Sequence, residues 1–185
     1  MIKVTMGRRA AEYPMRMVDR KGSLTPGILL GLGLGGFFDG VVLHQVLQWH
    51  HMTSSAGYPP ETAESLRINT FADGMFHAVT YIFVLAGVFL LWRQASKPDF
   101  GLSGPLLVGS LLAGFGAFNV IEGTINHHLL EIHHVNETAP EAHWIWWDLG
   151  FLIWGALMLG AGLAMLRRHQ QRPTISKCDR PGTLG

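Results

Sequence analysis

The stretch GLGLGGFFDGVVLHQVLQWHHM, residues 31–52, decides the fold, because it recurs 83 residues later as GFGAFNVIEGTINHHLLEIHHV, residues 114–135. Chance seldom aligns so many rare residues in one register. The polar positions that coincide in the two copies are Asp39 with Glu122, His44 with His127, Gln48 with Glu131, and His50 and His51 with His133 and His134. Each copy is apolar at its start and ends in histidines, which predicts two equivalent membrane helices with polar ends.

The match continues into the segments that follow. At an offset of 75 residues Asp73 aligns with Asp148, and Phe76 aligns with Phe151. One hairpin separates the equivalent helices, so they run in the same direction. The sequence therefore predicts an all-α protein of two tandem helical hairpins, residues 27–93 and 104–167, related by a pseudo-twofold axis along the membrane normal.

Composition and hydropathy predict an integral membrane protein. Of the 185 residues, 48% are hydrophobic and 15% are charged. A bilayer is spanned by about 20 apolar residues, and only helices fit segments of that length. The predicted spans are residues 27–49, 73–92, 104–130 and 145–166. They form a four-helix membrane domain, residues 27–167, between a basic tail, residues 1–26, and a polar tail, residues 168–185.

The distribution of positive charge predicts the orientation. Thirteen of the 14 lysines and arginines fall on one side of a four-span chain, and Arg67 is the exception. The positive-inside rule then places both termini in the cytoplasm. Basic residues that flank membrane spans are the normal topology signal, so the bilayer is the expected partner and nucleic acid is not.

The polar residues gather at the opposite, non-cytoplasmic ends of the spans. Imidazole and carboxylate groups together are the ligand chemistry of zinc, iron and copper(II), and ionisable residues inside a membrane mark functional sites. The predicted ligands of a transition metal are His44, His50, His51, Asp73, His77, His127, His133, His134 and Asp148. The deeper Asp39 and Glu122, together with His128, are predicted to support these ligands or to relay protons.

Helical geometry suggests two layers within this site. His44 and His51 are seven residues apart and share a helical stripe with Gln48, if the helix continues through them. At a rise of about 1.5 Å per residue, Asp39 then lies roughly 18 Å inward from His51. Leu152 occupies the position that is equivalent to His77 in the second half, so the site is pseudosymmetric at best. The sequence does not decide between one metal ion and two, or between copper, iron and zinc.

Other functions remain open on the sequence alone. Opposed histidines on membrane helices could ligate haem iron, but two would suffice and the remaining polar residues would be unexplained. A proton or metal transport module could use Asp39 and Glu122 as a relay. The chain could also be an assembly subunit of a respiratory complex, or its polar residues could form a purely structural network. Whether the protein is an enzyme is not decided.

The strings FFDGVVLHQVLQWHHM, DGMFH, FNVIEGTINHHLLEIHHV and WDLGF resemble a bacterial family of predicted membrane proteins known as domain of unknown function 2243. The resemblance covers residues 27–162. It implies a multi-pass protein of the bacterial inner membrane and no particular reaction. By analogy with relatives near respiratory oxidase assembly components, it suggests respiratory or metal-handling membrane proteins as partners.

Overall fold

The structure, a computed structural model, describes residues 24–98 and 100–171. Four of its helical segments are long and apolar enough to cross a membrane, and the described residues contain no strand. The elements are α1 (Leu24–Phe37), the π-helix η2 (Phe38–Val46), α2 (Ala63–Ala95), α3 (Gly104–Glu122), the π-helix η3 (Gly123–Leu129), the short 3₁₀-helix η4 (Glu141–His143) and α4 (Trp144–Gln171). The predicted all-α fold with four spans is therefore confirmed.

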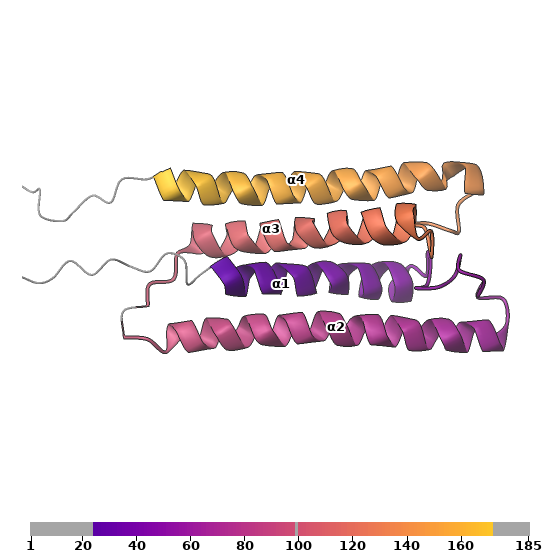
Figure 1. Cartoon of the computed structure of the whole chain (residues 1–185), viewed down its shortest axis with the longest axis horizontal. Helices are drawn as coiled ribbons and strands as arrows, with labels where there is room; N and C mark the ends of the chain where they lie inside the picture. Colours follow the sequence, from indigo (N-terminus) through magenta and orange to yellow (C-terminus); the bar gives the residue numbers. More distant parts are fainter. Residues whose placement is uncertain (1–23, 99, 172–185) are drawn as a thin grey trace, which may run out of the picture.

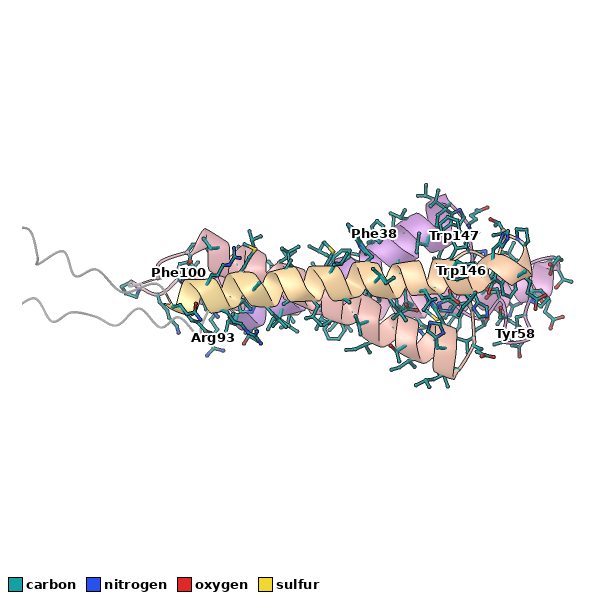
Figure 2. All side chains as sticks on the ribbon, turned by 90° about the horizontal axis from the view of Figure 1, so that it is seen from above. Phe38, Tyr58, Arg93, Phe100, Trp146 and Trp147 are labelled. Atoms are coloured by element: carbon teal, nitrogen blue, oxygen red, sulfur yellow. The ribbon has the colours of Figure 1, made fainter. Side chains whose placement is uncertain are left out.

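The four long helices form a row in the order α2, α1, α3, α4 (Figure 1). The start of α1 and the end of α4 lie at the same end of this row. The connections that follow η2 and η3 lie at the other end. Figure 2, turned by 90°, shows α1 and α3 crossing as an X behind α4, with Trp146, Trp147 and Tyr58 toward one end and Arg93 and Phe100 toward the other.

The crossing of α1 and α3 depends on glycine. A methyl group built on Gly31 would lie 2.1 Å from the carbonyl oxygen of Leu111, and one on Gly114 would lie 2.2 Å from that of Ile28. Side chains are excluded here, so the two backbones touch, as small residues allow between membrane helices. Both contacts obey the sequence offset of 83, since Gly31 corresponds to Gly114 and Ile28 to Leu111.

The outer helices dock in the same way. A methyl group on Gly33 would approach the Thr80 carbonyl oxygen of α2 to 2.9 Å, and one on Gly116 would approach the Gly155 carbonyl oxygen of α4 to 2.5 Å. Thr80 and Gly155 are separated by the offset of 75 residues. The α1–α2 and α3–α4 contacts therefore use equivalent positions.

The prediction of a regular helix through His51 is wrong. The first span widens into π-helix from Phe38 and ends at Val46, and Leu47 N then donates to Val42 O at 2.8 Å. Gln48 has a φ of 50°, in the left-handed region that non-glycine residues seldom adopt, and Glu131 has 48° at the equivalent position. The chain therefore turns at Gln48, and the histidines that follow it lie in a loop.

Two helices are longer than hydropathy suggests. Thr62 caps α2, because its side-chain oxygen accepts a hydrogen bond from Ser65 N at 3.1 Å. The first ten residues of α2 are mostly polar, so a search for apolar spans misses them. Of the two predicted tails, only residues 24–26 and 168–171 are described, and they belong to α1 and α4.

Asn69 of α2 anchors the connection between η2 and α2. Its side chain, fully buried, accepts from Thr53 N at 3.0 Å and donates to Tyr58 O at 2.6 Å. Because the connection carries His50 and His51, Asn69 also fixes the part of the chain that delivers these histidines.

We expect Gly31→Ala to lower the free energy of unfolding by about 1–3 kcal/mol, because the added methyl group overlaps backbone that cannot move aside alone. Gly160→Ala is the matched control, since a methyl group there has nothing within 4 Å. Unfolding in detergent followed by circular dichroism measures both. Equal stability of the two variants would contradict the backbone contact.

We expect Asn69→Ala to cost about 1–3 kcal/mol, because it leaves the buried amide of Thr53 without its acceptor. Thr70→Ala, on the neighbouring exposed position, should change stability little. The same unfolding measurement applies. A loss of stability in Thr70→Ala as large as that in Asn69→Ala would show that the anchor is not specific.

Candidate metal centre

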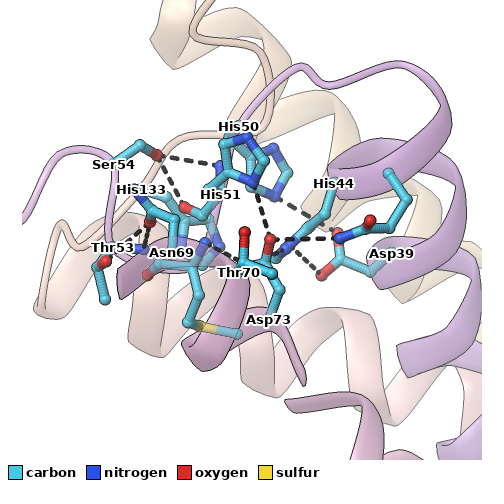
Figure 3. A network of polar contacts seen from close by, with 12 residues as sticks. Asp39, His44, His50, His51, Thr53, Ser54, Asn69, Thr70, Asp73 and His133 are labelled. Carbon is cyan, nitrogen blue, oxygen red and sulfur yellow. Dashed lines mark hydrogen bonds and ion pairs between the residues drawn. The ribbon is translucent and has the colours of Figure 1, made fainter. Parts of the chain in front are cut away.

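A cluster of imidazoles and carboxylates is buried at the end of the bundle where η2 and η3 lie. Its members come from η2, α2, the end of α3, η3, α4 and the two connections, and each is at most 6% exposed. They are Asp39, His44, His50, Asp73, Glu122, His127, His133 and Asp148. Figure 3 shows the half of the cluster around Asp39, His44 and Asp73.

In the first half, two histidines face one deep carboxylate. His44 Nε2 lies 3.3 Å from Asp39 Oδ2, and His50 Nε2 lies 3.8 Å from Asp39 Oδ1. The turn at Gln48 makes this possible, because it brings His50 back toward the helix interior. Asp39 is therefore close to both histidines, and the large separation that a continuous helix implies does not exist.

The second half repeats the arrangement with Glu122. His127 Nε2 lies 3.3 Å from Glu122 Oε1, and His133 Nε2 lies 3.1 Å from the same oxygen. A neutral imidazole has one N–H. His133 Nδ1 lies 3.2 Å from the carbonyl oxygen of Met52, so a neutral His133 cannot donate to both acceptors.

The two halves meet through His50 and His133. Their rings stack with centroids 4.6 Å apart and an angle of 3° between the planes. His50 Nδ1 donates to Val135 O at 2.8 Å, and His133 Nδ1 lies against Met52 O. Met52 and Val135 are equivalent residues, so each half orients a histidine of the other, and each Nε2 is left facing the deep carboxylate of its own half.

Two further carboxylates hold the rings from behind. Asp73 contacts His44 Nδ1 at 2.9 Å and His51 Nδ1 at 2.8 Å. Asp148 contacts His134 Nδ1 at 2.7 Å and lies 3.7 Å from His127 Nδ1. Backbone amides that follow the His-His pairs donate to the same carboxylates, from Met52 to Asp73 and from Val135 to Asp148.

Several buried polar atoms at the centre of the cluster have no hydrogen-bond partner among the described residues. The short contacts of His44 Nε2 and His127 Nε2 with the deep carboxylates do not have hydrogen-bond geometry. Unpartnered buried polar atoms are rare and costly. These atoms are both oxygens of Asp39, Oε2 of Glu122, and Nε2 of His44, His50 and His127.

His50 lies beyond the end of the first span and is a neutral base. Burial, followed by the proximity of His133 and His44, holds the pKa of His50 well below its ordinary value. Since its Nδ1 carries the hydrogen that it donates to Val135 O, the lone pair on Nε2 is free. A neutral imidazole in this tautomer is a metal ligand.

The remaining predicted site residues lie around the cluster. His51 and His134 are partly exposed, with 13% and 20% of their side chains accessible, and they contact Asp73 and Asp148 from the outside. His77 Nε2 is buried without a partner against Gly40, and His128 Nε2 is also buried without a partner. The groups of ligand atoms that lie within 4.8 Å of one another include neither of them; these groups are His44, His50 and His133, and Glu122, His127 and His133.

Sequence reasoning missed the groups that orient these histidines. The carbonyl oxygens of Met52 and Val135 carry no sequence signal, because any residue supplies one. Ser54 and Glu137 had a detectable signal, since the offset of 83 aligns them. Ser54 Oγ accepts from His51 N at 3.2 Å, and Glu137 Oε1 accepts from His134 N at 3.0 Å.

Comparisons with known proteins place the chain in a family. Neither the curated proteins nor the solved structures give a match. A family model described as "Predicted membrane protein (DUF2243)" matches residues 26–169, which include all four spans and every residue of the cluster. The resemblance seen in the sequence is confirmed, and the chain belongs to this family of predicted membrane proteins.

Proposed function

We propose that this membrane protein binds a transition metal through the buried cluster and uses it in redox chemistry or metal handling. One observation carries the proposal. The Nε2 atoms of four histidines face two deep carboxylates, three of the four have no hydrogen-bond partner, and their Nδ1 atoms face backbone or carboxylate oxygens on the other side. A cation supplies the partner that these atoms need.

The distances suit a shared metal ion. Two ligand atoms that each lie about 2.0–2.2 Å from one ion, at a tetrahedral angle, are about 3.3–3.6 Å apart. His44 Nε2 and Asp39 Oδ2 are 3.3 Å apart, as are His127 Nε2 and Glu122 Oε1. Small shifts would bring the 3.1 Å and 3.8 Å contacts of His133 and His50 into the same range.

The ligands proposed here differ in part from those expected from the sequence. We assign His44, His50, His127 and His133 to the metal, as expected, and add Asp39 and Glu122. Asp73 and Asp148 instead hold the Nδ1 sides of the rings, with His51 and His134 outside them. A carboxylate that accepts from a ligating histidine fixes its orientation and raises its basicity.

The charge balance also favours a cation. Four carboxylates are buried here, and among the described residues their ion pairs are with histidines and not with lysine or arginine. Isolated carboxylates in such surroundings cost several kcal/mol or more. The four residues are Asp39, Asp73, Glu122 and Asp148.

Imidazole and carboxylate donors suit zinc, iron or copper(II). Haem fits the cluster less well. Axial ligation needs two imidazoles on opposite faces of one flat porphyrin, whereas His50 and His133 stack directly against each other at 4.6 Å. An ion, or a pair of ions, fits the compact arrangement of donors.

The proposal includes the orientation and the internal repeat. The basic residues at the end of the bundle away from the cluster favour cytoplasmic termini, and hence a metal presented to the periplasmic side of the bacterial inner membrane. The glycine and histidine contacts recur at the sequence offsets of 83 and 75, and this recurrence supports two tandem hairpins around a pseudo-twofold axis.

Transport of protons or metal is the second candidate. It is favoured by Asn119, one helical turn from Glu122, which is fully buried with an unpartnered amide and so extends the polar region inward. Against it, Gly31 and Gly114 bring the backbones of α1 and α3 into contact farther along the bundle. That contact leaves a route along the axis closed, so a bound metal is the better interpretation.

We expect protein purified in detergent to retain a transition metal after a wash with a weak chelator, and the double variant His44→Ala with His127→Ala to lose it. Elemental analysis measures the metal, and circular dichroism verifies that the helices remain. His143→Ala, which removes an exposed histidine outside the cluster, is the control. Wild-type protein that takes up no zinc, iron or copper would refute the proposal.

We expect Asp73→Asn to weaken metal affinity about 10–100-fold, because the amide no longer accepts strongly from His44 Nδ1. Glu64→Gln makes the same chemical change at an exposed position of α2. Competition with a chromophoric chelator gives both affinities. If the two variants bind the metal equally well, Asp73 does not support a ligand.

A further inference from the structure

We infer that the cluster holds two divalent first-row metal ions, one bound by Asp39, His44 and His50, and the other by Glu122, His127 and His133. This inference rests on the proposed function, because it presumes that the cluster binds metal. It concerns how many ions are bound and which residues bind each of them.

Each half has a complete ligand set of its own. The histidines follow the carboxylate by five and eleven residues in both halves. Two imidazoles and one carboxylate are the protein ligands of many catalytic zinc and non-haem iron sites, in which further positions stay open. Within each half the carboxylate faces two Nε2 atoms, at 3.3 and 3.8 Å for Asp39 and at 3.3 and 3.1 Å for Glu122.

A single ion cannot use both deep carboxylates as the structure places them. Asp39 contacts only histidines of the first half, and Glu122 only histidines of the second half. One ion that served Glu122, His127 and His133 would leave both buried oxygens of Asp39 without a partner. Two ions satisfy both sets.

The two sets adjoin each other. Ligand atoms of His133 lie within 4.8 Å of those of His44 and His50, and also within 4.8 Å of those of Glu122 and His127. The stacked rings of His50 and His133 belong to different sets. Metal ions in two-metal sites are about 3.5–4 Å apart, so we expect ions this close to interact magnetically.

Charge supports the same count. Asp39, Asp73, Glu122 and Asp148 carry four negative charges when ionised, and two divalent ions balance them with every histidine neutral. One divalent ion would leave two negative charges in a buried site, where uncompensated charge is costly.

The two positions are related but not identical. His77 packs against Gly40 beside Asp39, whereas Leu152 packs against Gly123 beside Glu122. Asn119 lies one turn below Glu122, where the first half has Gly36. We therefore expect two ions with different affinities.

The test is the number of zinc ions retained by the full chain. Metal-free protein is loaded with Zn²⁺, washed with a weak chelator and measured by elemental analysis. We expect two ions per chain in the wild type and in His143→Ala, one in each of the equivalent variants His44→Ala and His127→Ala, and none in the double variant. Helix content and gel filtration verify that each variant folds.

The outcomes separate the two proposals. One zinc ion in the wild type, lost in both single variants, overturns the two-ion inference and leaves the proposed metal site standing. No zinc, iron or copper in the wild type overturns both. Two ions that both disappear in either single variant, while that variant remains folded, also overturn the assignment of one ion to each half.

A second measurement needs no variant. Wild-type protein is titrated with Cu²⁺ to one and to two equivalents, and its electron paramagnetic resonance spectrum is recorded. We expect the second equivalent to broaden or diminish the signal of the first through magnetic coupling. A signal that doubles in intensity with an unchanged line shape shows ions too far apart to share this cluster, and overturns the inference.

Discussion

Four carboxylates buried among histidines, inside helices that must also be apolar enough for a membrane, are the constraint on which the rest of the structure depends. In such surroundings each polar atom needs a partner, and the chain supplies them mostly from histidine and backbone. Asp73 and Asp148 are fully engaged by imidazoles and amides. Asp39 and Glu122 are not, and their unpartnered oxygens define the centre of the site.

Close backbone packing allows these groups to meet. Where Gly31 crosses Gly114, α1 and α3 approach until their backbones touch, and beyond the crossing both helices widen into π-helix at the level of the cluster. π-Helical turns are rare and are found frequently at functional sites. Here they occur twice, at corresponding places, and each is followed by a non-glycine residue in the left-handed region, Gln48 or Glu131.

The reciprocal bonds of His50 and His133 make the two halves interdependent. Each ring is oriented by a carbonyl group of the other half, so neither half could hold its histidines in place alone. An ancestor built from two identical hairpins would have the same contacts by symmetry. The replacements at His77 and Leu152, and at Gly36 and Asn119, then allow the two positions to differ in chemistry without disturbing the shared contacts.

The sequence by itself determined the four helical spans, the duplicated pattern and the gathering of histidines and acids at one end, because hydropathy and spacing are local properties of a chain. Only the tertiary structure decided which atoms face one another. A helix continued through His51 would keep Asp39 far from the His-His pair, but the turn at Gln48 brings His50 to 3.8 Å from Asp39. The pairing of His50 with Val135 O depends on two segments 85 residues apart meeting in space, and no local pattern encodes such a contact.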